Sequence, residues 1–169
     1  MAQMFFNDTE AVRIAQTMET NGLAFYEQAA GRSRSPQVRE TFLQLAEDER
    51  KHLSTFRELQ QTLAARRADP PPAAEDADSL GPYIDGLLKT QVFSRQGAVA
   101  KLSGQAADDL EALAVGMKAE RDSILFYQEM LDFVDSKEAQ AAFSWILKEE
   151  RKHLQTLSER SQQCAGMTP

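Results

Sequence analysis

One stretch of this sequence occurs twice, 101 positions apart and without a gap. The segment Glu49-Arg50-Lys51-His52-Leu53 returns as Glu150-Arg151-Lys152-His153-Leu154, which is not expected by chance. Residues before this segment repeat at the same offset: Glu19, Phe25, Tyr26, Ser35 and Phe42 return as Glu120, Phe126, Tyr127, Ser136 and Phe143. A duplicated helical hairpin explains a match of this kind.

Apolar residues recur at helical spacing throughout both copies, whereas glycine and proline are few and clustered. The pattern predicts four long helices, at about 9–30, 35–66, 106–134 and 136–161. Asp8 or Thr9 is the expected N-cap of the first helix, and Ser35 before Pro36 is a good N-cap for the second. The loop inside each copy is only a few residues long, so each pair of helices is expected to form an antiparallel hairpin.

The two hairpins, at about 9–67 and 106–161, are joined by a linker over about 68–105 that contains Asp69-Pro70-Pro71-Pro72. This run of prolines cannot continue a helix. A connection this long can return along the whole bundle, which makes the second and third helices parallel. We therefore predict an all-α four-helix bundle with one long crossover, as a single domain over 1–169. A short helix is expected near 82–90, irregular structure at 97–104 and a frayed tail at 162–169.

The chain is acidic, with 19 Lys and Arg against 26 Asp and Glu and a net charge of −7. This balance argues against binding to nucleic acid or to an anionic membrane. No apolar run approaches the roughly 20 residues that span a bilayer. The first eight residues do not resemble a signal peptide, so a cytoplasmic location is expected. The single cysteine, Cys164, excludes an intramolecular disulfide and a four-cysteine metal site, and we interpret it as an incidental tail thiol.

Each predicted apolar stripe is interrupted near its middle by a glutamate, and on two helices also by a histidine. Glutamate is almost never fully buried unless it is paired or bound to metal. The glutamates of one hairpin lie roughly 14 to 16 residues either side of its turn, which at about 1.5 Å per residue places them at one level. Packing of the two hairpins then brings together Glu19, Glu49, His52, Glu120, Glu150 and His153.

These six residues form the donor set of a dinuclear carboxylate site, in which two helices give a Glu and two give Glu-x-x-His. Four carboxylates carry a charge of −4, which two divalent cations would cancel. Mixed oxygen and nitrogen ligands suit iron or manganese, and zinc can also bind. The alternative is that all six are exposed polar residues on amphipathic helices, which would make both the core register and the repeat accidental. The neighbouring Glu47 and Glu149 fall outside the register.

On these motifs, the sequence resembles the ferritin-like superfamily, and within it the rubrerythrin-like group of di-iron proteins. The resemblance covers both hairpins but not the linker, and it implies a ferritin-like bundle. It further implies that Glu19 binds one metal with His52 and that Glu120 binds the other with His153. In the same scheme, Glu49 and Glu150 bridge the two metals.

The sequence departs from the pattern of typical rubrerythrins in two ways. Those proteins carry a C-terminal rubredoxin-like iron site built from four cysteines, and this chain has only Cys164. They also have an extra glutamate one turn after the first ligand of the third helix, where this chain has Ser123. The resemblance therefore implies the metal site more firmly than it implies peroxide reduction.

We predict a dinuclear oxidoreductase, with two iron ions as the favoured cofactor and manganese or zinc as alternatives. Its expected partners are O₂ or H₂O₂ and an external electron donor, and a homodimer is compatible with the sequence. Oxidation of Fe(II), reduction of peroxide and oxygenation of an organic substrate all remain open. The main alternative is a non-catalytic protein that binds or handles metal, with a redox-silent ion such as zinc. A plain helical interaction module is a third reading.

Several side chains near the motifs have two possible roles. Tyr26 and Tyr127, one heptad from Glu19 and Glu120, either act as catalytic residues that hydrogen-bond a ligand carboxylate or simply pack in the core. The aromatic residues Phe42, Phe143 and Trp145 are expected in the core. The basic residues Arg50, Lys51, Arg151 and Lys152 are expected on a solvated face.

Overall fold

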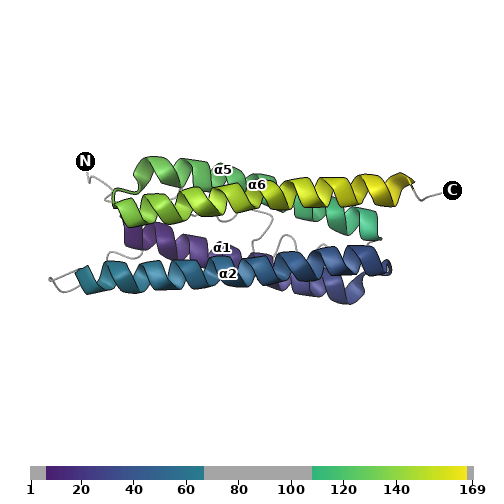
Figure 1. The fold of residues 1–169 in the computed structure, drawn as a ribbon, viewed down its shortest axis with the longest axis horizontal. Helices are drawn as coiled ribbons and strands as arrows, with labels where there is room; N and C mark the ends of the chain where they lie inside the picture. The colour runs from purple at the N-terminus through teal and green to yellow at the C-terminus, as the bar shows by residue number, and fades with distance from the viewer. Residues whose placement is uncertain (1–6, 67–107, 167–169) are drawn as a thin grey trace, which may run out of the picture.

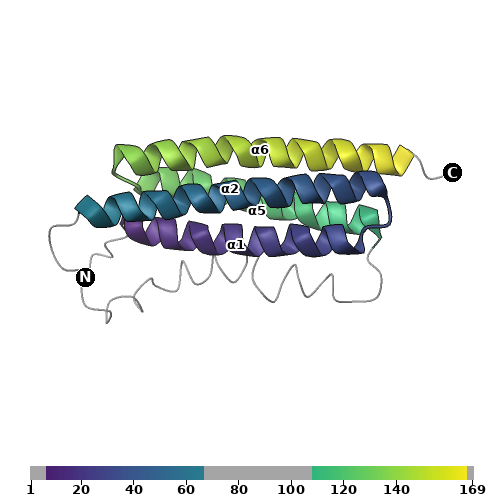
Figure 2. The same cartoon turned by 60° about the horizontal axis from the view of Figure 1, so that its bottom comes forward.

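The computed structural model describes residues 7–66 and 108–166, which form four helices. The first hairpin consists of α1 (Asp8–Arg32) and α2 (Pro36–Arg66), and the second of α5 (Asp109–Phe133) and α6 (Lys137–Gly166). Each hairpin packs closely within itself, α2 packs on α6, and α1 packs on α5. Figure 1 shows the hairpins as two layers, and Figure 2 shows α2 lying between α1 and α6.

The chain directions agree with the predicted ferritin-like bundle. In Figure 1, α2 ends at one end of the bundle and α5 begins at the opposite end, so these two helices run parallel. The helices of each of the four packed pairs described above therefore run antiparallel. The predicted linker 68–105, its helix at 82–90 and the irregular stretch at 97–104 lie outside the described residues. None of the described helices is long and apolar enough to cross a membrane.

The ends of the helices differ from the prediction in small, explicable ways. The N-cap of α1 is Asn7, whose Oδ1 accepts from the backbone N–H of Thr9 and Glu10 at 3.0 and 3.2 Å. The Glu10 carboxylate in turn accepts from the Asn7 N–H, which completes a capping box. The helix therefore begins at Asp8, and the prediction of Asp8 or Thr9 as the cap was wrong.

The prediction of a frayed tail was wrong over 162–166, because α6 continues to Gly166. Two contacts hold the C-terminal end of α6. Arg160 donates from Nε to Thr41 Oγ1 at 2.9 Å, and half-buried Cys164 packs against an apolar cluster of the bundle. Cys164 is the repeat counterpart of buried Leu63, so it is part of the packing and not an incidental tail thiol.

The two hairpins are tied together at both ends by equivalent aspartates at the first position of α1 and α5. Asp8 accepts from the backbone N–H of Asp135 and Ser136 at 2.8 and 3.0 Å. At the other end, Asp109 accepts from the N–H of Arg34 and Ser35 at 3.2 and 2.8 Å. Each aspartate thus supplies acceptors for the start of a helix in the opposite hairpin, where backbone donors lack helical partners.

The apolar core is split into two clusters. One contains Phe56, Tyr127 and Phe143, and the other contains Tyr26 and Phe42, which are the repeat counterparts of Tyr127 and Phe143. The predicted core positions of Phe42 and Phe143 are confirmed, since both side chains are fully buried. On every helix the two clusters are separated by a short polar stretch, which places a buried polar layer near the middle of the bundle.

Candidate metal centre

All six predicted residues meet in this polar layer. Helices α1 and α5 each contribute one glutamate, and α2 and α6 each contribute a glutamate and a histidine three positions later, on the same helix face. Each of the six is at most 3% exposed: Glu19, Glu49, His52, Glu120, Glu150 and His153. The alternative of exposed polar residues is therefore wrong.

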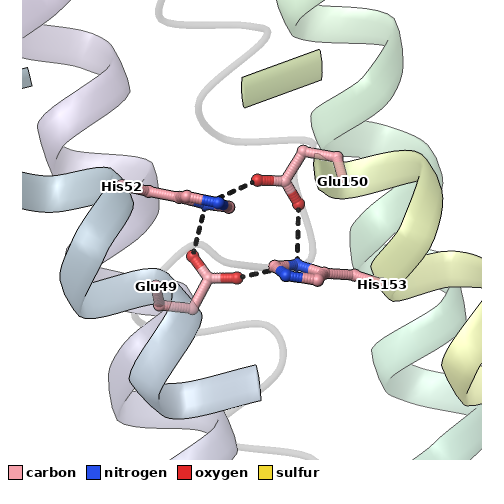
Figure 3. Close-up of side chains that lie close together, drawn as sticks. All are labelled: Glu49, His52, Glu150 and His153. Carbon is pink, nitrogen blue, oxygen red and sulfur yellow. Dashed lines mark ion pairs between the residues drawn. The ribbon is translucent and has the colours of Figure 1, made fainter. Parts of the chain in front are cut away.

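Four of these residues, from α2 and α6, form a closed ring. In Figure 3 the carboxylates of Glu49 and Glu150 alternate with the imidazoles of His52 and His153. One donor atom from each of the four lies within 4.8 Å of the others. This spacing is close enough for the four residues to share metal ions.

The two glutamates of the ring each face both histidines. Glu150 places Oε1 3.1 Å from His52 Nδ1 and Oε2 3.4 Å from His153 Nδ1. Glu49 places Oε2 3.9 Å from His52 Nδ1 and Oε1 3.5 Å from His153 Nδ1. Each carboxylate therefore directs its two oxygens to two different positions, which is what a bridging ligand has to do.

The remaining two glutamates each approach one histidine. Glu19 Oε2 lies 3.2 Å from His52 Nδ1, and Glu120 Oε1 lies 3.6 Å from His153 Nδ1. Both imidazoles thus present the same nitrogen, Nδ1, to the centre of the cluster. The arrangement gives two similar positions, one beside His52 and one beside His153, each with one carboxylate of its own.

The two tyrosines hold the outer glutamates across the interface between the hairpins. Tyr26 Oη donates to Glu120 Oε1, and Tyr127 Oη donates to Glu19 Oε1. The heptad spacing relates each tyrosine to the glutamate of its own helix, but its hydroxyl reaches the glutamate of the other hairpin. Burial strongly raises the pKa of both phenols, and the nearby carboxylates add to the effect. Both tyrosines therefore stay protonated donors at neutral pH.

Burial of several carboxylates at one level is electrostatically costly without metal. Burial raises the pKa of Glu49 well above its usual value, and the charges of Glu19 and Glu150 raise it further. Burial also raises the pKa of Glu120, as does the charge of Glu150. Burial alone would raise the pKa of Glu150, but its interactions with Glu120 and with the imidazole of His153 outweigh burial and lower the pKa. The metal-free cluster therefore retains protons at neutral pH.

Both histidines also hold protons in the metal-free protein. Burial would lower the pKa of His52, but its hydrogen bonds to Glu150 and Glu19 raise the pKa to about 10. The pKa of His153 is raised in the same way, because its interactions with the nearby carboxylates of Glu120 and Glu150 outweigh burial. Metal ligation requires a deprotonated Nδ1, so metal binding would release these protons.

The donor set fits divalent metal ions. Four carboxylates and two imidazoles converge in the buried interior, and some of their buried atoms, including Glu120 Oε2 and His153 Nε2, have no hydrogen-bond partner in the described part of the chain. Buried polar atoms without partners are rare in folded proteins. A cation between the carboxylates would satisfy their oxygens and remove the repulsion.

Two residues next to the cluster were not recognised from the sequence. Asp48 lies behind His153, with Oδ2 3.8 Å from Nε2. The prediction that Trp145 belongs to the core was wrong, because this side chain is 42% exposed. It packs edge-on against His52, with ring centroids 5.5 Å apart and planes at 85°. Ser123, which stands where the family has an extra glutamate, is buried on α5 one turn after Glu120.

Comparison with known proteins agrees with this architecture. A family model described as Rubrerythrin matches residues 10–160. The bundle is similar to a dodecameric thioferritin, the bacterioferritin-related protein of Bacteroides fragilis, with a TM-score of 0.67 and 21% identity over 95% of this chain and 87% of that one. It is also similar to a DUF305 fragment of Deinococcus radiodurans, with a TM-score of 0.67 and 16% identity over 92% of this chain and 95% of that one. At these identities the structural likeness shows the fold alone. No curated protein matched the chain.

Proposed function

Since the chain belongs to the rubrerythrin family, we propose that its buried cluster holds two metal ions, with iron favoured, and that the protein is an oxidoreductase. Its oxidant would be O₂ or H₂O₂, and an external donor would supply electrons. Two ferrous ions in the cluster would supply the electrons for reduction of the oxidant.

The observation that carries the proposal is the sharing of Glu49 and Glu150 between the two histidine positions. A single metal ion needs no carboxylate with its two oxygens directed to two imidazoles. The outer glutamates, Glu19 and Glu120, would each complete one position. This distribution supports two ions with two bridging and four terminal ligands.

The protein groups around the cluster have clear tasks under this proposal. The hydroxyls of Tyr26 and Tyr127 orient the outer glutamates. The two apolar clusters exclude water from either side of the polar layer, which strengthens the electrostatic interactions within that layer. The external donor would return the metal ions to their reduced state, because every reduction of the oxidant consumes electrons from them.

The same cluster would also suit a metal-binding protein without catalytic activity, holding an ion such as zinc. Ser123 favours this second candidate, because a serine in place of the family's extra glutamate cannot act as a carboxylate ligand. The two functions differ in whether the bound metal changes its oxidation state.

The test is anaerobic loading with Fe(II), metal analysis, and exposure to O₂ or H₂O₂ with and without a reductant. We expect two irons per chain, near-ultraviolet absorption of the ferric product, and sustained turnover only with the reductant. Glu49→Gln should abolish this behaviour, whereas Glu47→Gln, at an exposed position two residues away, should match the wild type. Binding of zinc with no oxidation of Fe(II) would favour the second candidate.

A further inference from the structure

The six residues of the cluster repeat without change between the two hairpins, but the two histidines have different neighbours on the side away from the cluster. Behind His153 stands Asp48, whose Oδ2 is 3.8 Å from Nε2. The repeat counterpart of Asp48 is Glu149, which could in principle stand behind His52. Both carboxylates bind the lysine three positions later, Asp48 Oδ1 to Lys51 Nζ at 2.7 Å and Glu149 Oε1 to Lys152 Nζ at 2.6 Å. Of the two, Asp48 also places its second oxygen beside a histidine, whereas the carboxylate contacts of His52 described above all run through Nδ1.

A second difference one helical turn earlier explains the first. Gln44 donates from Nε2 to Oδ1 and Oδ2 of Asp48, at 3.3 and 3.2 Å, and so holds this carboxylate. At the repeat-related position stands Trp145, which packs its ring edge against His52 and offers no amide to Glu149. One histidine is thus backed by a fixed carboxylate, and the other by an indole.

The protons of His153 show why this matters for a metal. If Nδ1 of His153 binds metal, the proton of the neutral ring sits on Nε2. That nitrogen is buried and has no hydrogen-bond partner in the described part of the chain, and Asp48 Oδ2 is the carboxylate oxygen beside it. A small closure of the 3.8 Å gap would give Nε2–H its acceptor. A carboxylate behind a metal-binding histidine fixes the tautomer and makes the ligating nitrogen more basic.

We propose that Asp48 is a positioning residue for His153 and makes the two metal positions unequal. The position beside His153 and Glu120 fills first, and the position beside His52 and Glu19 fills second. This inference rests on the proposed dinuclear function. Loss of such a supporting partner costs roughly 10–100-fold in metal affinity, so the two steps should differ by about that factor.

The experiment uses the fact that the chain has only two histidines. Protein labelled with ¹⁵N-histidine is titrated with Zn²⁺, and the side-chain nitrogen signals of both rings are followed by NMR. A His52→Gln variant assigns the signals. In the wild type, we expect the His153 signals to change during the first equivalent of zinc and the His52 signals during the second.

The variants separate a positioning role from a general structural one. Asp48→Asn, which conserves shape on a partly exposed face, should weaken the first step by roughly 10–100-fold and make both histidines respond together. Gln44→Ala should act in the same direction with a smaller effect. Glu149→Gln is the matched control, since it breaks the corresponding ion pair with Lys152 and should keep the wild-type order.

The possible failures are distinguishable. If zinc saturates at two per chain but both wild-type histidines respond in parallel, the inference is wrong and the dinuclear function stands. If Asp48→Asn keeps the wild-type order, Asp48 has no positioning role. If saturation occurs at one zinc or none, the proposed dinuclear site fails and the inference fails with it.

Discussion

The two hairpins of this bundle share their buried site residues and differ on their exposed faces. Inside, every buried glutamate, histidine and tyrosine of the polar layer has an identical counterpart 101 positions away. Outside, Arg50 pairs with Glu27 and Glu47, whereas the counterparts of these two acids around Arg151 are Gln128 and Lys148. Exposed ion pairs add little to stability, so such pairs can be exchanged freely. Buried carboxylates are tolerated only when their charges are balanced, so the polar layer has to change as a whole or not at all.

The largest effects should come from residues that both halves share. Glu49→Gln and Glu150→Gln should each weaken binding at both metal positions, by more than about 100-fold, because a residue merely supporting a ligand is already worth roughly 10–100-fold. A bridging carboxylate also screens the repulsion between the two cations. His52→Ala and His153→Ala each remove one donor from one ion and should mainly weaken one position.

Equilibrium dialysis with anaerobic Fe(II) measures these stoichiometries. Wild type should reach two irons per chain, each histidine variant one tight iron, and each glutamate variant none at the same free metal concentration. Two tightly bound irons in Glu49→Gln would show that Glu49 does not bridge.

Next in size should be an opposite pH dependence of the metal-free and metal-loaded proteins. The pKa of His52 is about 10 in the folded protein, above its usual value of ~6.5. The proton on His52 therefore contributes its full stabilisation below pH ~6.5, and this contribution to the free energy of unfolding is lost as the pH rises towards 10. The raised pKa values of Glu49 and Glu120 act in the same direction above pH ~4.5. The lowered pKa of Glu150 makes the free energy of unfolding depend on pH only below pH ~4.5. Each extra proton held by the folded state changes the free energy of unfolding by about 1.4 kcal/mol per pH unit.

Thermal melts between pH 5.5 and about 9 test this dependence. The metal-free protein should lose stability as the pH rises, whereas the gain in melting temperature on adding Zn²⁺ should increase, because metal competes with protons for the same atoms. Glu49→Gln, which removes one buried carboxyl group that titrates in this range, should flatten the metal-free curve. A metal-free melting temperature that rises with pH would contradict the buried-charge account.

The tyrosines should give a smaller effect that crosses between the hairpins. Tyr26→Phe removes the donor to Glu120 and should weaken the position beside His153, although Tyr26 lies in the other hairpin. Tyr127→Phe should weaken the position beside His52 through Glu19. We expect about tenfold for each, at the low end for partners of metal ligands. The ¹⁵N-histidine titration reads out which position is affected, and an effect on the tyrosine's own hairpin would refute the crossed arrangement.

Periodicity and the repeat were sufficient to predict the four helices, the one-crossover topology and the common level of the six buried polar residues. The helices and the common level of these residues depend on spacing along a helix, and the topology depends on the length of the connection between the hairpins; the sequence contains both directly. Trp145 was misplaced because its aromatic character was given more weight than its position, which lies one residue from the buried stripe through Ile146. The roles of Asp48 and Asp109 could not be predicted, because their contacts depend on how one hairpin packs against the other.

The smallest expected effect lies at the ends of the bundle, where the two aspartate ties differ by one hydrogen bond. Asp109 accepts a third hydrogen bond from Ser33 Oγ at 2.8 Å, whereas Val134, the repeat counterpart of Ser33, has no hydroxyl to offer Asp8. Asp8→Ala should cost about 0.5–2 kcal/mol, the usual range for loss of a side chain that caps a helix start. Asp109→Ala should cost about 1 kcal/mol more, the net value of one further hydrogen bond.

Urea unfolding of the metal-free variants at fixed pH measures both costs, and Ser33→Ala isolates their difference. In the Ser33→Ala background, the cost of Asp109→Ala should fall to that of Asp8→Ala, because the third donor is already absent. The cost of Asp8→Ala should be the same in both backgrounds, since Ser33 lies at the opposite end of the bundle and distant sites are additive. If the hydrogen bond from Ser33 Oγ to Asp109 contributes no stability, Asp8→Ala and Asp109→Ala should cost the same free energy of unfolding in the wild-type background. The ends of the bundle would then be as symmetric in energy as its metal-binding layer is in sequence.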